Sequence, residues 1–298
     1  VTSGAAGTFT RSSGSFITDG FLIGHVVNWS GWATTGVPNN AHNFLITALS
    51  ATVMTGIMLD GVAIGAKAAG DSVTGVTTKF VKVPLTGHTR DYWTIEHNFA
   101  DIVQSEQFKD CVFKSMNVKL PATGMATVDF NVMGLDMDTS TSAYFTSPTA
   151  PTTTGVLAAA NGALYIAGVA VGYITAMDFT VDGNHTVPGG VVGSNVDPDV
   201  FPGSVEVSGN ISVLLVDATM RDYFKNETEV SIIACFTTGN TATAGYQSHV
   251  FPRCKIGGAG KDDGEKGLTM TMPFMALENP AVAGQLQSTY MVQDSSFV

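Results

Sequence analysis

The side chains best spaced for chemistry are oxygen donors in the segment NVDPDVFPG. Asn195, Asp197 and Asp199 occupy alternate positions, as the first ligands of a calcium-binding loop do. The proline inside the segment weakens this match. His249 and Cys254, which lie five positions apart across a proline, are the other pair that could hold a metal. Neither pattern completes a known metal motif, so we predict no metal site and no cofactor.

The sequence also lacks the patterns of a catalytic site. Glu96 and His97 are adjacent in WTIEHNF, and neighbours on a strand point to opposite faces of a sheet. They therefore cannot share one site. The other histidines are scattered, and the chain contains no G-x-S-x-G, no G-x-x-x-x-G-K-[ST] and no G-x-G-x-x-G before a helix. We predict that the protein is not an enzyme.

Polar side chains instead recur at every second position of several predicted strands. In MATVDFNVMGLDM, one face carries Thr127, Asp129 and Asn131, and the other face carries apolar residues. Three further stretches share this property, through Ser115, Asn117 and Lys119; Asp178, Thr180 and Asp182; and Ser204, Glu206, Ser208, Asn210 and Ser212. Two interpretations are open. One is a sandwich whose outer faces meet water, and the other is a sheet that lines a water-filled channel shared among subunits.

The elements that must position these rows are predicted to be almost entirely β. Short strands between Gly, Asn and Pro residues predict a small all-β module over residues 1–88, which ends in the hinge PLTGHTR. Longer strands predict a β-sandwich domain over residues 89–298, with a long Thr-, Ser- and Pro-rich loop at 138–162. Apolar spacing favours a short helix or helical turn in ADIVQSEQFKD and another in DATMRDYFKNE.

Composition limits the classes of partner. Only 13% of the 298 residues are charged and the net charge is −11, which argues against the clustered cations of sequence-independent nucleic-acid binding. Cys111, Cys235 and Cys254 are an odd, scattered set, so we expect free, mostly buried thiols and synthesis in the cytoplasm. No stretch reaches the ~18 uncharged apolar residues of a membrane span, and we expect a soluble chain with no membrane insertion.

Longer stretches resemble structural proteins of tailed bacteriophages. The segment GSFITDGFLIGHVVNWSGW, with NNAHNFLITALSATVMTG after it, is similar to a module common in such proteins. The second domain resembles, over nearly its whole length, the tail tube (major tail) proteins of long-tailed, siphovirus-type phages. The similarity depends on the order and spacing of YWTIEHNFADI, FKDCVFKSMNVKLPATGMATVDFNVMGLDM, GALYIAGVAVGYITAMDFTVDGN, FPGSVEVSGNISVLLVDATMRDYFKNETEVSIIACFTT and GLTMTMPFMALENPA. The departures are His25, where the module usually carries an acidic residue, and the position of the module before the tube domain.

The resemblance implies a structural protein of the virion tail. Its subunit is expected to be an all-β tail-tube β-sandwich with a short helix, which forms six-membered rings with other copies of itself. The inner sheets of the six would join into one oligomeric β-barrel, and stacked rings would form the conduit for DNA ejection. Other phage tail proteins are the expected partners, and duplex DNA would pass through without specific binding.

This role would give the polar rows and the long loop distinct tasks. A wall along which DNA slides should avoid cations that bind phosphate, so the lumen-lining candidates are Asp129, Asn131, Asp178, Asp182 and Glu206. The loop is expected to act as an arm that docks on an adjacent ring, with the contact candidates Tyr144, Phe145, Pro148 and Pro151. The C-terminal QLQSTYMVQDSSFV is expected to extend a strand or to cross to the next ring.

A second function class stays open on the sequence. Trp29, Trp32 and Trp93 could act as sugar-stacking platforms of a secreted or cell-surface β-sandwich that binds glycans. That alternative predicts a monomer with exposed tryptophans.

Overall fold

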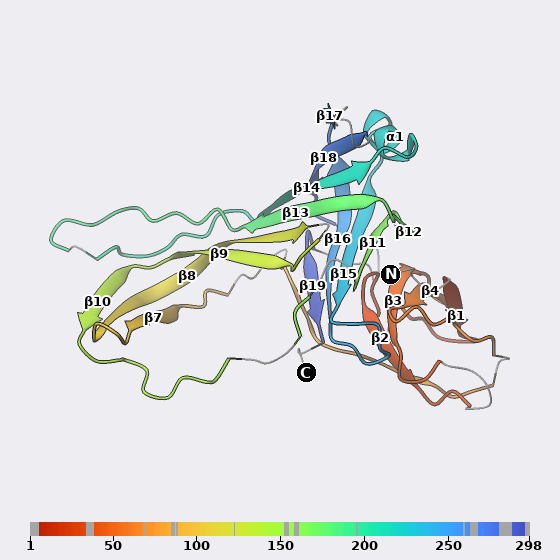
Figure 1. The fold of residues 1–298 in the computed structure, drawn as a ribbon, viewed down its shortest axis with the longest axis horizontal. Helices are drawn as coiled ribbons and strands as arrows, with labels where there is room; N and C mark the ends of the chain where they lie inside the picture. Colours follow the sequence, from red (N-terminus) through yellow and green to blue (C-terminus); the bar gives the residue numbers. More distant parts are fainter. Residues whose placement is uncertain are drawn as a thin grey trace.

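The predicted all-β fold is confirmed by a computed structural model, in which one short helix accompanies the strands (Figure 1). The structure describes residues 6–33, 39–67, 70–84, 87, 89–121, 123–151, 155–157, 161–194, 196–258, 260–262, 268–279 and 288–295.

Five strands near the N-terminus form a small sheet in the order β1-β4-β3-β2-β5. They are β1 (Gly7–Thr10), β2 (Val26–Ser30), β3 (Asn43–Leu49), β4 (Val53–Met58) and β5 (Thr74–Thr77). These stretches are rich in β-branched and aromatic residues, which fit a pleated, half-buried surface. Their inward side chains, including Trp29, Phe44 and Met54, form a buried cluster with less than 4% of each residue exposed.

The remaining strands described form a second, larger sheet with the path β10-β8-β13-β14-β18-β16-β15-β11-β12. The strands are β6 (Phe80–Lys82), β7 (Trp93–Phe99), β8 (Gln104–Pro121), β9 (Thr127–Met133), β10 (Asp136–Ser140), β11 (Gly162–Ile166), β12 (Val169–Ala170), β13 (Ile174–Asp182), β14 (Glu206–Leu214), β15 (Val230–Thr237), β16 (Tyr246–Ile256), β17 (Gly260–Asp262), β18 (Thr269–Ala276) and β19 (Met291–Asp294). Within the C-terminal segment, Met291–Asp294 forms β19, which pairs with β16 and β6 of the same chain.

The larger sheet folds over on itself into two layers. One layer contains β9, β8, β13 and β14, and the other contains β11, β15, β16 and β19, while β18 pairs with both β14 and β16 (Figure 1). The main core lies between the layers. Its centre is the fully buried Phe179 of β13, whose ring lies 4.9 Å from that of Phe251 on β16 and 5.6 Å from that of Tyr290. Burial of such aromatic side chains is the main force that holds the layers together.

One of the two helix predictions is confirmed and the other is wrong. The segment DATMRDYFKNE contains α1 (Thr219–Lys225), which buries Met220. The segment ADIVQSEQFKD instead forms the turn between β7 and β8 and the start of β8 itself. Ile102 and Val103, which suggested an apolar helix face, are each 62% exposed at this turn. Pairing of β8 with β7 on one side and β10 on the other fixes the backbone as a strand, which local spacing could not reveal.

The small sheet packs tightly against the larger one. Val26, Leu45 and Ile57 share a buried cluster with Ile233 and Val250 of β15 and β16. Gly24, with a φ of 86°, is required at this junction, because a Cβ there would lie 2.2 Å from Val250 Cγ2. Strand β6 lies before residue 88 yet belongs to the larger sheet. The division of the chain into domains at residue 88 stays a prediction.

Candidate functional site

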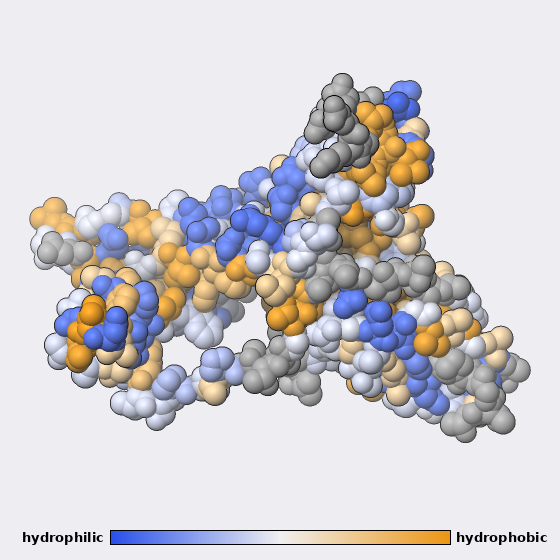
Figure 2. Space-filling model, in the orientation of Figure 1, coloured by the Kyte–Doolittle hydropathy of each residue, from blue (hydrophilic) through white to orange (hydrophobic). Residues whose placement is uncertain are grey.

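Four neighbouring strands align their polar residues on one face. Strand β8 pairs with β9 on one side and β13 on the other, and β13 pairs in turn with β14. Because residues directly opposite each other share a face of the sheet, the registers form three rows across the strands. The rows are Asn131–Ser115–Asp182–Glu206, Asp129–Asn117–Thr180–Ser208 and Thr127–Lys119–Asp178–Asn210. We call these twelve residues the polar face; Figure 2 shows a hydrophilic area over the strands that carry it.

The structure therefore brings all five lumen-lining candidates together. Asp129 and Asn131 of β9 and Glu206 of β14 are exposed, whereas Asp178 and Asp182 of β13 are half-buried. Their sequence positions span 78 residues, from 129 to 206, so the sheet register alone makes them one surface. That this surface lines a bore stays a prediction.

Side-chain hydrogen bonds within the polar face satisfy its amide donors. Asn131 Nδ2 donates to Ser115 Oγ at 2.7 Å, and Asn117 Nδ2 donates to Thr180 Oγ1 at 2.9 Å. Asn210 Nδ2 donates to a carboxylate oxygen of Asp178 at 3.1 Å. Each bond joins two neighbouring strands. A donor already bound to its neighbour has less to gain from a passing acceptor.

The charge of the polar face is negative. Its four carboxylates belong to Asp129, Asp178, Asp182 and Glu206, and Lys119 is its one cation, so the net charge of the twelve residues is −3. Lys119 Nζ lies 3.1 Å from Asp129 Oδ2. This pair is well exposed and adds little stability, but it places the lysine's charge beside a carboxylate.

The reverse side of the same strands is apolar. Val118, Phe179 and Ile211 on β8, β13 and β14 are buried against the second layer, each with at most 1% exposed. Strand β9 differs from these three strands, because its apolar side is not buried. Its apolar residues Val128, Phe130 and Val132 are 42%, 57% and 38% exposed, because no part of the chain described here covers the reverse side of β9.

Strand β9 has a free edge among the described residues, whereas strand β14 does not. Strand β9 pairs with β8 and with no other strand of the described residues. Strand β14, which also lacks proline, is paired with β13 and β18 along its whole length. Strand β14 therefore offers no unpaired edge to another chain.

The predicted arm at 138–162 begins as a strand. Strand β10 pairs with β8, and β7, β8 and β10 project together from the body (Figure 1). The residues that follow β10 are held by Glu96, whose carboxylate accepts the backbone amides of Tyr144 and Phe145 at 2.8 and 2.9 Å. Hydrogen bonds to Ser105 and to the Phe145 amide lower the pKa of Glu96. Pro148 and Pro151 are exposed, and docking of this arm on another ring stays a prediction.

The weak metal candidates do not assemble into a site. The Asp199 carboxylate accepts hydrogen bonds from Tyr92 at 2.7 Å and from Arg90 at 2.5 Å, and these two bonds lower the pKa of Asp199. Asn195 lies outside the described residues. His249 and Cys254 are both buried on β16, and His249 Nδ1 lies 2.7 Å from the Tyr290 hydroxyl. The part of the chain that the structure describes contains no group of three His, Cys, Asp or Glu side chains that could hold a metal.

The three cysteines are free and buried, as predicted. Burial raises the pKa of Cys235 to about 12 and also raises the pKa of Cys254 and Cys111. These thiols are therefore poor nucleophiles at neutral pH.

The tryptophans do not form a sugar-binding platform. Trp29 is 3% exposed in the core of the small sheet, and Trp32 packs against that core with its ring 6.4 Å from that of Trp29. Trp93 is 55% exposed, but it lies on β7 in the larger sheet. Trp29 is buried and Trp32 is half-buried against the same core, so these two side chains do not form an exposed sugar-stacking surface.

Sequence reasoning missed the exposed aromatic residues on the reverse side of β8 and β9. Phe113 and Phe130 are 43% and 57% exposed. Alternation put Phe130 on the apolar side of β9, but it put Phe113 on the same side as Ser115. Phe113 reaches the reverse side because the register of β8 against β9 shifts between Phe113 and Ser115. The sequence held no signal for this, because period-two alternation is the same whether the chain itself or a partner covers the apolar face.

Comparison with known proteins identifies a family. A model of the family described as phage tail tube protein matches residues 5–276, so the match includes the small N-terminal sheet and all of the larger sheet except β19. No curated protein matches the chain. Among the described residues, no helix has both the length and the apolar character needed to cross a membrane.

Proposed function

The chain belongs to the phage tail tube protein family, and from this premise we propose that six copies close into a ring and that stacked rings form a hollow tube. As a structural protein of the virion tail, it has other phage tail proteins and itself as partners. The observation that carries the proposal is the alignment of three polar rows over an apolar core. Within the ring, Asp129, Asn131, Asp178, Asp182 and Glu206 would face the bore.

The dimensions of the polar face suit this role. Six copies of a four-stranded face, with strands about 4.8 Å apart, give a circumference of at least about 115 Å, because β18 pairs with the outer side of β14 and adds to the distance between copies. The corresponding diameter is about 37 Å at the backbone, before strand tilt widens it. That width leaves room for side chains and for a DNA duplex. One copy with four such strands cannot close a bore of this size, so the channel requires the assembly.

The chemistry of the polar face supports guidance of DNA without binding. Each lysine or arginine that contacts a phosphate releases counterions and stabilises a bound state, which would slow a sliding duplex. The polar face has a net charge of −3, and Asp129 accompanies its lysine. At physiological salt, repulsion from the carboxylates extends over only about 8 Å. The bore would therefore repel DNA weakly at short range and would not bind it.

The segment after β10 is proposed to contact an adjacent ring. Tyr144 and Phe145 are fixed at its start by Glu96, and Phe145 is 47% exposed. Pro148 and Pro151 follow in an exposed, extended stretch with no regular structure at 141–151. Such a stretch has little to pack against in its own chain and is available to another.

Electron microscopy of the purified chain, with size-exclusion chromatography across a concentration series, tests the proposal. We expect rings or tubes of six-fold symmetry whose bore is bounded by β9, β8, β13 and β14. A chain that stays monomeric at high concentration would contradict the proposal. So would a tube in which the polar face lies on the outer surface.

A further inference from the structure

Each nitrogen-bearing side chain of the polar face is bound to a side chain of the adjacent strand. Four of its twelve residues carry such a nitrogen donor, three of them asparagines and one a lysine. The four bonds are Asn131 to Ser115 at 2.7 Å, Asn117 to Thr180 at 2.9 Å, Asn210 to Asp178 at 3.1 Å and Lys119 to Asp129 at 3.1 Å. Phosphate oxygens of DNA accept hydrogen bonds, so these donors are the groups best able to hold a duplex.

The register of the strands sets the asparagine bonds. In all three, the donor and the acceptor lie directly opposite each other in neighbouring strands, where side chains on one side of a sheet meet. The backbone ladder therefore fixes both partners before the bond forms. A bond to a passing phosphate would instead require the amide to leave its partner and become ordered again on the DNA. The sheet thus favours the internal bond.

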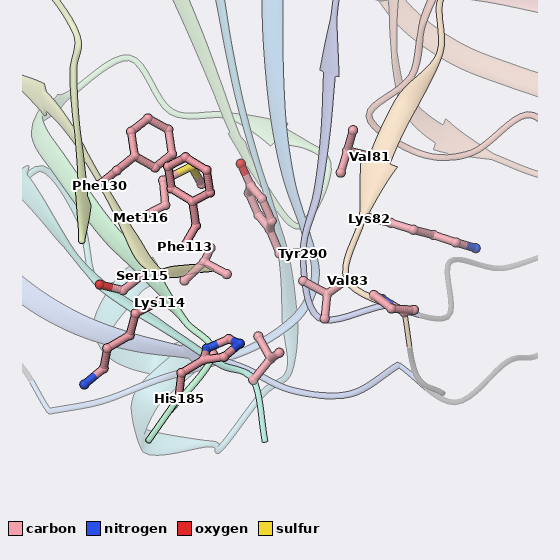
Figure 3. A pocket seen from close by; sticks show the side chains of 14 residues that line it. Val81, Lys82, Val83, Phe113, Lys114, Ser115, Met116, Phe130, His185 and Tyr290 are labelled. Atoms are coloured by element: carbon pink, nitrogen blue, oxygen red, sulfur yellow. The ribbon is translucent and has the colours of Figure 1, made fainter. Parts of the chain in front are cut away.

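The Ser115 hydroxyl is placed to act only through the amide that it binds. Phe113 and Met116 border an apolar hollow of about 330 Å³ on the reverse side of β8, and Figure 3 shows the Ser115 hydroxyl pointing away from the centre of this hollow. Ser115 is 8% exposed, whereas Asn131 of β9 is exposed. A duplex in the bore would meet the asparagine and not the serine.

We propose that Ser115 and Thr180 are positioning residues that prevent the polar face from binding DNA, because they hold the amides of Asn131 and Asn117 within the sheet. The inference rests on the proposed function. It adds a determinant of sliding that is independent of net charge, since the amides are neutral. Asparagine side chains are among the groups that bind phosphates in protein complexes with DNA. An acceptor on the next strand makes such a donor less available.

Hydroxyl substitutions in the tubes of whole particles test the proposal. Ser115→Ala removes the acceptor without a change in charge, and we expect DNA release at least about threefold slower, because the freed Asn131 amide of every copy can donate to phosphates. Thr180→Val, which keeps the shape of the side chain, should act in the same way through Asn117. Ser208→Ala is the matched control, since Ser208 lies on the polar face but accepts none of the three asparagine amides.

Two further measurements separate this effect from a structural defect. Asn131→Ala combined with Ser115→Ala removes the freed donor and should restore the wild-type rate of release. A neutral amide displaces no counterions, so the slowing of Ser115→Ala relative to the wild type should persist as salt is raised. Slowing that the second substitution does not reverse, or that salt abolishes, overturns the inference.

Failure of this inference differs from failure of the proposed function. Wild-type rates of release in both Ser115→Ala and Thr180→Val, from tubes whose bore electron microscopy shows to be lined by the polar face, overturn the inference and leave the proposed function intact. A tube with the polar face on its outer surface overturns both. The two hydroxyl variants are independent, so either one decides the matter if the other does not assemble.

Discussion

The side-chain amide of Gln293 on β19 pairs with both backbone groups of Val26 on β2. Gln293 Oε1 accepts the Val26 amide at 2.7 Å, and Gln293 Nε2 donates to the Val26 carbonyl at 3.2 Å. Gln293 is fully buried and Val26 is 1% exposed. The glutamine thus replaces a neighbouring strand at the point where the two sheets meet, and it satisfies backbone groups that would otherwise be buried without partners.

Loss of this pairing should destabilise the whole chain. Gln293→Leu removes the amide and leaves the N–H and C=O of Val26 unpaired, at a cost of about 1–3 kcal/mol for each group. We expect the free energy of unfolding to fall by roughly 3 kcal/mol, measured by urea denaturation. Gln104→Leu is the matched control, because Gln104 is exposed at the start of β8, and it should change stability by less than about 0.5 kcal/mol. A Gln293→Leu variant as stable as this control would show that the pairing contributes little.

Stability should decline as the pH falls below neutrality. His25 and His249 are buried, and burial lowers the pKa of each from 6.5 to about 4. The unfolded chain therefore binds protons at a higher pH than the folded chain does. The stability is fully present above pH 6.5 and is lost as the pH falls from 6.5 to about 4. We expect a loss of roughly 2 kcal/mol per histidine between pH 7.5 and pH 5.

Variants separate this effect from general acid sensitivity. In His25→Leu, the difference in unfolding free energy between pH 7.5 and pH 5 should shrink by about 2 kcal/mol, whatever the variant's absolute stability. His97→Gln, which removes an exposed histidine of β7, should leave the difference unchanged. If the His25→Leu variant keeps the full pH dependence, His25 does not titrate as its burial predicts.

The carboxylate of Glu96 should govern how firmly the segment after β10 is held. It accepts the amides of Tyr144 and Phe145 and the hydroxyl of Ser105, and hydrogen bonds to a charged group contribute more than neutral ones. In Glu96→Ala we expect protease cleavage within residues 141–151 to become at least about tenfold faster in the dispersed chain. Glu106→Ala, on the adjacent strand β8, is the control. Equal cleavage rates in the two variants would show that contacts other than those of Glu96 hold this segment.

Cations on the polar face should impede DNA. Asp129→Lys combined with Asp178→Lys puts two additional lysines on that face, and each new phosphate contact adds a salt-dependent attraction. We expect tubes to form and DNA release from particles to slow by about tenfold at low salt, with recovery as salt is raised. Asp19→Lys with Asp91→Lys makes the same change in net charge away from the polar face and should release DNA normally. An unchanged rate of DNA release in the first variant would show that Asp129 and Asp178 do not face the bore.

The sequence by itself determined the type of fold and the contents of its strands. Period-two alternation depends only on the covalent order of residues, so Asp129, Asp178 and Glu206 could be assigned to polar sides of strands before any pairing was known. The family resemblance likewise depends on order and spacing, and the family match confirms it. Helix α1 was predictable because Met220 and Tyr223, three positions apart, lie on one side of a helix, and both pack against the main core.

The tertiary structure decided which of these sides meet and which are covered. Register between strands far apart in the chain aligned Asp182 with Ser115 and Glu206, and no local pattern specifies such a register. Pairing with β7 and β10 made a strand of residues expected to be helical, because ladder hydrogen bonds from distant segments outweigh weak local propensity. The exposure of Phe130 was hidden for a related reason. Alternation fixes which side of a strand is apolar, whereas only the packing of the complete chain shows whether that side has been covered.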